Sequence, residues 1–178
     1  AMRRPIPIIL FAIAAALSGG ASAAERPLTI AAAANLKDVM RALVADFRMT
    51  RAGAKVDVVL GSSGKFAQQI AHGAPYDLFF SADLEYPQRL VTEQLTTSGV
   101  RTYARGQLAL WSATRAERDL TLANLAAPGV RRVAIANPKL APYGARAQQA
   151  LERAGVWDKV RDKLVFGENV SQTAQFAD

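Results

Sequence analysis

Small polar residues follow apolar runs at four places in the sequence: Asn35, Ser62-Ser63, Tyr143-Gly144 and Asn169-Val170. At each place a strand pattern ends and a helical pattern begins. The first N–H groups of a helix have no partner within the helix, and they favour a negative charge. Ligands of open parallel sheets bind at the carboxyl ends of the strands, where these groups gather. The pattern therefore predicts an anion-binding site, although a serine before a helix is also a common N-cap.

The elements that must position these residues alternate between strand and helix. Strands are expected at 27–33, 55–60, 77–82, 108–111, 133–136 and 163–166. Helices are expected at 36–49, 65–72, from about 83, at 120–125, before Gly155, and at 170–176. This alternation predicts an α/β fold in which helices cover parallel sheets.

The helix expected at 36–49 has apolar residues at spacings of three and four, so one of its faces should be buried. That face consists of Leu36, Val39, Met40, Leu43, Val44 and Phe47. Asn35 stands where an N-cap is expected, with its amide free to donate to a group outside the helix.

A polar stretch at 103–107 interrupts the alternation and is expected to cross between two domains. We therefore predict a first α/β domain at 24–104 and a second at 105–178.

The N-terminus has the pattern of a secretory signal peptide, which we place at residues 1–23. Arg3 and Arg4 precede an apolar run from Ile6 to Leu17, and Ala21-Ser22-Ala23 is a small-residue cleavage signal. No later stretch approaches the roughly 20 apolar residues of a spanning helix. The sequence thus predicts an exported, soluble protein of the periplasm.

The composition narrows the chemistry further. The chain has no Cys, which excludes disulfides and thiolate metal sites, and its single His argues against a histidine metal site. The net charge is +7, but Lys and Arg are scattered among the acids, so no nucleic-acid partner is expected. A monomer is the default expectation.

An envelope hydrolase with Ser62 or Ser63 as nucleophile is an alternative. The surrounding residues do not form a nucleophile elbow, and His72 lies about two turns along the following helix. No enzyme activity is therefore expected. A transcription factor is a further alternative, but no helix-turn-helix pattern precedes residue 24.

Several stretches resemble the periplasmic molybdate-binding proteins of ABC transporters. They are AAAANL (31–36), GSSGK (61–65), GAPYDLFFSAD (73–83), ANP (136–138), APYG (141–144) and ENV (168–170). The resemblance implies a type II periplasmic binding protein fold, with mixed, mostly parallel sheets flanked by helices. Two such domains would close on a tetrahedral oxyanion and deliver it to an ABC permease in the inner membrane.

The resemblance also implies a ligand set. Asn35 would make the first-loop contact, Ser63 would donate through hydroxyl and backbone, and Tyr143 and Val170 would close from the second domain. The phenol of Tyr143 would either donate to the anion or narrow the cleft. Secondary contacts would come from Ala34, Ser62 and Lys65. No cofactor and no direct metal ligand are implied, because molybdate or tungstate would be held through its oxygens.

The residue types agree with that ligand. A buried dianion needs a hydrogen bond at every oxygen, and neutral donors favour a guest that carries no proton of its own. Phosphate is therefore disfavoured at neutral pH, whereas sulfate or another small anion stays an alternative. Lys65 could steer the anion, although a solvated lysine on a helix face is the simpler interpretation.

We also expect the sequence to be incomplete. Binding proteins of the type resembled cross between domains twice, and only the crossing at 103–107 is found. Residues 175–178 end the chain inside a helical pattern with no C-cap glycine. A strand of the second sheet, the return crossing, the final elements packed on the first domain and a late tyrosine would be missing. Weak or absent anion binding and poor stability are therefore expected.

Overall fold

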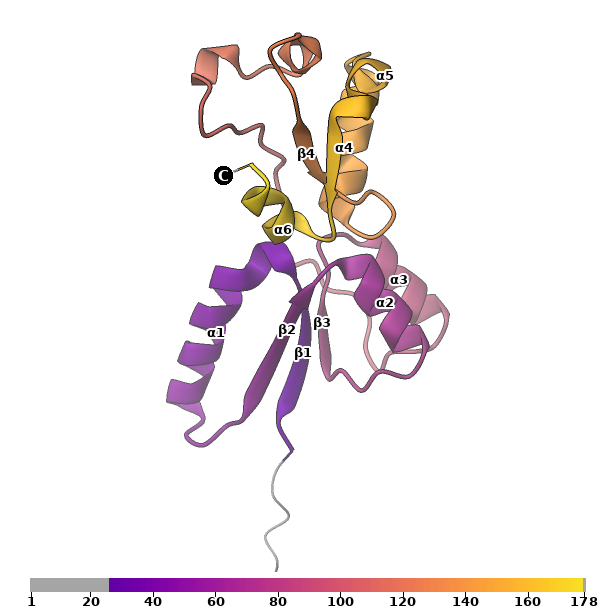
Figure 1. The fold of residues 1–178 in the computed structure, drawn as a ribbon. Coiled ribbons are helices and arrows are strands. Elements are labelled where there is room, and N and C mark those ends of the chain that lie inside the picture. The colour runs from indigo at the N-terminus through magenta and orange to yellow at the C-terminus, as the bar shows by residue number, and fades with distance from the viewer. Residues whose placement is uncertain (1–25, 178) are drawn as a thin grey trace, which may run out of the picture.

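The computed structural model describes residues 26–177 (Figure 1), so the signal peptide predicted at 1–23 lies outside the described residues. The strands are β1 (Leu28–Ala33), β2 (Val56–Gly61), β3 (Leu78–Phe80), β4 (Val133–Ala136) and β5 (Leu164–Gly167). The α-helices are α1 (Lys37–Thr50), α2 (Ser63–Ala71), α3 (Glu85–Thr92), α4 (Pro142–Arg153), α5 (Trp157–Val160) and α6 (Val170–Gln175). Short 3₁₀ helices are η1 (Ala34–Leu36), η2 (Glu117–Asp119), η3 (Ala123–Ala126) and η4 (Arg161–Lys163).

The first sheet has the strand order β2-β1-β3, and both pairs are parallel. In β1, Ala31 and Ala32 are fully buried, as expected for a central strand covered on both faces. Figure 1 shows α1 on one side of this sheet and α2 and α3 on the other. We call this sheet and its helices the first lobe.

The second sheet pairs β4 with β5, again in parallel, with Ala136 opposite Gly167. With α4 and α5 it forms the second lobe, and Figure 1 shows α6 between the two sheets. The α/β class with parallel sheets, predicted from the alternation, is confirmed in the described residues.

Each lobe has its own apolar core. The core of the first lobe is formed by Ile30, Ala32, Leu36, Met40 and Val56. The core of the second is formed by Leu125, Val130, Val133, Ile135, Leu151, Val156 and Val160.

The predicted apolar face of α1 is only partly buried. Met40 is 3% exposed, whereas Val39, Leu43 and Phe47 are 52%, 49% and 39% exposed. The expectation that the whole face points inward was wrong, because only one edge of it meets the sheet in the described part of the chain.

The strand predicted at 108–111 does not form. Residues 93–116 contain no helix and no strand, and Leu108 and Trp111 are about half exposed. A strand needs a hydrogen-bonding neighbour, and none of the described strands pairs with this segment. The helix predicted at 120–125 is likewise only the 3₁₀ turn η3.

None of the helices within residues 26–177 combines the length and the apolar character needed to cross a bilayer.

Candidate functional site

A small cavity lies where the two lobes meet, with a volume of about 10 Å³, roughly the space of one water molecule. Its walls come from both lobes. It is lined by Ala33, Ala34, Asn35, Gly61, Ser62, Ser63, Ala82, Ala141, Pro142, Tyr143, Asn169 and Val170.

The four main residues predicted for the ligand, Asn35, Ser63, Tyr143 and Val170, all line this cavity. The secondary residues Ala34 and Ser62 line it too. The sheet explains half of this arrangement, because the register pairs the end of β1 with the end of β2 and so brings the two following turns together. The roles of these residues as ligands stay predictions.

Ser62 has a buried hydroxyl with no partner. The residue is 2% exposed, and its Oγ makes no hydrogen bond with any group of residues 26–177. It occupies the N-cap position of α2, yet its side chain does not cap the helix. A buried polar group without a partner is destabilising, so such groups are rare and call for an explanation.

Ser63 differs from its neighbour. It is fully buried, and its Oγ accepts a hydrogen bond from the backbone N–H of Ala82 at 3.0 Å. This bond ties the turn after β2 to the turn after β3. A hydroxyl has one proton to give, which Ser63 can still donate into the cavity.

Asn35 does not cap α1, so that prediction was wrong. The chain first winds through the 3₁₀ turn η1, and Leu36 takes the N-cap position with no side-chain hydrogen bond. Asn35 is the middle residue of η1 and is exposed. Its amide is therefore not engaged at the helix terminus.

Tyr143, in the first turn of α4, lines both the cavity and a larger open groove of about 490 Å³. Asp83, Glu85 and Arg146 also line that groove. The phenol lies so close to Gly106 that a Cβ there would overlap it. The segment near the predicted crossing thus packs against the tyrosine.

Val170 is the first residue of α6, and Asn169 caps that helix by accepting from the N–H of Gln172 at 3.0 Å. Ser171 reaches the other lobe, where its Oγ donates to the carbonyl of Ala34 at 3.1 Å. The sequence pattern did not single out Ser171, because a serine in a helix carries no signal of its distant partner.

Two further contacts join the lobes beside the cavity. The N–H of Gly64 donates to the carbonyl of Leu140 at 2.8 Å. Lys65 Nζ lies 2.6 Å from Glu168 Oε1, and Lys65 is not among the residues that line the cavity.

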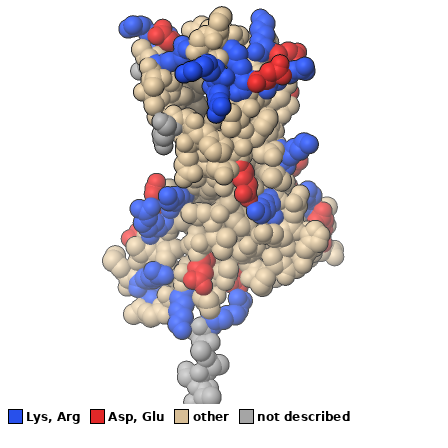
Figure 2. All heavy atoms as spheres, viewed as in Figure 1, with Lys and Arg blue, Asp and Glu red and all other residues tan. Residues whose placement is uncertain are grey.

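Within the described part of the chain, no charged residue lines the cavity. The titratable groups with shifted pKa values lie outside it. Burial raises the pKa of Asp83, against the opposing effect of its hydrogen bond from Ser81. Burial also raises the pKa of Tyr103, whose phenol donates to the carbonyl of Ser81. On the face shown in Figure 2, basic and acidic residues are interspersed over both lobes.

The geometry does not support serine hydrolysis. His72 sits at the carboxyl end of α2, where its Nδ1 contacts the carbonyl of Gln68 at 2.7 Å. Ser63 begins the same helix, and a helix of that length separates its two ends by roughly 13 Å. Among residues 26–177, no group of His, Asp and Glu is arranged to hold a metal ion.

Residues 28–178 match the family described as "Bacterial extracellular solute-binding protein". The chain belongs to this family. This solute-binding protein is 40% identical over 161 residues to the molybdate-binding protein ModA of Azotobacter vinelandii, an alignment that covers 90% of this chain and 63% of the relative. It is 38% identical over 172 residues to ModA of Rhodobacter capsulatus, covering 90% of this chain and 68% of that one.

The solved structure of the periplasmic molybdate-binding protein of Azotobacter vinelandii superposes with a TM-score of 0.77 at 35% identity. The match covers 84% of this chain and 66% of that protein. This chain therefore has the α/β fold of periplasmic binding proteins, as predicted. It spans less than two thirds of the length of the first relative named above.

Proposed function

We propose that this chain binds a tetrahedral oxyanion, molybdate or tungstate, in the cavity between its lobes. One observation carries the proposal: Ser62 Oγ is buried without a partner in a cavity lined by uncharged residues from both lobes. An oxygen of a bound anion would accept from that hydroxyl and remove its desolvation penalty. The names of the relatives support the choice of ligand.

The binding chemistry is that of neutral donors. Ser62 and Ser63 stand at the start of α2, and Tyr143 stands in the first turn of α4. Helix N-termini and hydroxyls stabilise an anion without a fixed positive charge. Asn35 and the backbone N–H of Val170 complete the proposed set, and Ala34 contributes a wall.

The cavity must widen for the ligand. Its volume of about 10 Å³ suits about one water molecule, and a five-atom oxyanion is several times larger. Binding therefore requires the lobes to move apart and close again around the anion.

We also propose a cellular location and a protein partner for this chain. The protein is exported by residues 1–23, remains in the periplasm, and hands the anion to an ABC permease in the inner membrane. It acts as a monomer and not as an enzyme, and it needs no cofactor, since the anion is its ligand.

Calorimetry with molybdate, tungstate, sulfate and phosphate tests the proposal. Molybdate and tungstate are expected to bind more tightly than sulfate, and phosphate is expected not to bind at pH 7. Ser63→Ala should weaken molybdate binding by roughly 1 to 3 kcal/mol through loss of a donor to a charged group. Tighter binding of sulfate would contradict the choice of ligand, and an unchanged affinity would contradict the role of Ser63.

A further inference from the structure

Two opposite charges face each other across the boundary between the lobes. Lys65 belongs to the first turn of α2, and Glu168 lies between β5 and α6. Their side chains meet at 2.6 Å and are 51% and 45% exposed. They are 103 residues apart in the sequence, so the pair exists only when the two lobes are together.

The pair lies beside the cavity. Lys65 is two residues from Ser63, and Glu168 is two residues from Val170, and both of those neighbours line the cavity. The bonds Gly64 N–H to Leu140 and Ser171 to Ala34 also cross the boundary. Of these links, only the ion pair joins two opposite full charges.

We propose that the Lys65–Glu168 ion pair is a latch that favours the closed arrangement of the lobes and slows release of the bound anion. A contact made only in the closed state shifts the population toward that state by its own free energy. Glu168 also neutralises the charge of Lys65, which follows the proposed donor Ser63 by two residues, so the site keeps its selectivity through neutral groups. The part concerning release rests on the proposed function, whereas the part concerning closure does not.

The closure is tested first without any oxyanion in the buffer. Because the sequence has no Cys, Met49→Cys on α1 and Asp158→Cys on α5 can be labelled specifically, and pulsed electron paramagnetic resonance measures the distance between the lobes. Met49 is 81% exposed, and Asp158 is exposed as well.

Glu168→Lys replaces the attraction between residues 65 and 168 by a repulsion between two lysines. The ratio of closed to open protein is expected to fall roughly 2- to 5-fold, the range for a partly exposed pair. The exchange Lys65→Glu with Glu168→Lys restores the attraction and should return the distances to those of the parent.

Asp38→Lys is the matched control, because it makes the same charge change in an exposed pair with Arg41 within α1. It should leave the distances unchanged. The latch is overturned if Glu168→Lys also leaves them unchanged, if the exchange fails to restore them, or if Asp38→Lys has the same effect.

The second measurement is the release rate of molybdate by stopped-flow fluorescence. Release should be roughly 2- to 5-fold faster in Glu168→Lys and normal in the exchange variant. Equal release rates in the parent and Glu168→Lys would overturn the effect on release. If the parent binds no oxyanion, the proposed function fails, and the distance measurement alone decides the latch.

Discussion

Ser62 and Ser63 are adjacent residues of one type in opposite situations. Both are almost completely buried, but only Ser63 has a protein partner, the N–H of Ala82. The partner decides what each hydroxyl contributes to the folded protein. Ser63 holds two turns together, whereas the buried hydroxyl of Ser62 destabilises the folded protein until a ligand accepts a hydrogen bond from it.

This contrast predicts opposite effects on stability. Ser62→Ala removes an unpaired polar atom, so the free energy of unfolding should stay the same or rise by up to about 1 kcal/mol. Ser63→Ala leaves the N–H of Ala82 unpaired and should lower it by roughly 1 to 3 kcal/mol. Urea denaturation followed by circular dichroism, without oxyanion, measures both. Equal losses in the two variants would mean that Ser62 has a protein partner in solution.

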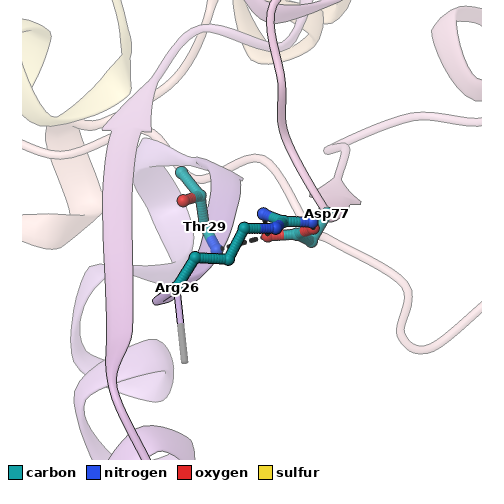
Figure 3. Close-up of polar contacts among 3 residues, drawn as sticks. All are labelled: Arg26, Thr29 and Asp77. Carbon is teal, nitrogen blue, oxygen red and sulfur yellow. Dashed lines mark hydrogen bonds and ion pairs between the residues drawn. The ribbon is translucent and has the colours of Figure 1, made fainter. Parts of the chain in front are cut away.

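At the scale of elements, Asp77 fixes the start of β3 against β1. Figure 3 shows its carboxylate between the guanidinium of Arg26 and the backbone N–H of Thr29. The two bonds from Arg26 are 2.6 and 3.0 Å, and the bond from Thr29 is 2.7 Å. The hydrogen bonds from Arg26, followed by that from Thr29, hold the pKa of Asp77 below its ordinary value.

The lowered pKa of Asp77 sets the direction of an acid effect. Its stabilising contribution is present above the pKa of the unfolded chain, about 3.9, and is lost as the pH falls below that value through the lower folded pKa. Asp77→Asn should therefore lower the melting temperature at pH 7 by a few degrees, in the range of about 2 to 4 °C.

The difference between the parent and Asp77→Asn should shrink below about pH 4. Melting curves followed by circular dichroism between pH 3 and 7 measure it. Asp38→Asn is the control, because that carboxylate is 84% exposed and pairs only within α1. A difference that grows in acid would contradict the role of Asp77.

At the scale of the whole molecule, the lobes approach closely at Gly64. A Cβ added there would lie 2.7 Å from the carbonyl oxygen of Leu140 in the second lobe and 2.6 Å from the phenol oxygen of Tyr86. Both distances are too short for real contacts. Glycine is thus required for the lobes to close as they do.

Gly64→Ala should consequently destabilise the closed arrangement by roughly 1 to 3 kcal/mol, the usual penalty of overpacking. The distance distribution between labels at Met49→Cys and Asp158→Cys should move to longer values. Gly99→Ala is a suitable control, since nothing lies within 4 Å of the added Cβ. An unchanged distribution in Gly64→Ala would show that Leu140 and Tyr86 can move aside with the lobes still closed.

Local sequence patterns predicted part of the cavity lining, but not Ala33, Ala82 or Ala141. The succession of an apolar strand, a small polar turn and a helix indicated Asn35, Ser62-Ser63, Tyr143-Gly144 and Asn169-Val170. The family resemblance then selected Asn35, Ser63, Tyr143 and Val170 among them. Such patterns are reliable because the hydrogen bonds of a strand end and a helix start are set by neighbouring residues. Parallel pairing of the strands is then enough to bring the successive turns to one edge of the sheet.

Whether a polar group finds a distant partner depends on tertiary contacts. Ser62 and Ser63 are equivalent in the sequence, and the position of Ala82 separates them. The sequence pattern indicates a solvated lysine at position 65, whereas in the structure Lys65 forms an ion pair with Glu168 of the other lobe. In the same way, residues 108–111 have the composition of a strand, but none of the described strands pairs with them. Each outcome depends on contacts between residues far apart in the chain, which no local pattern contains.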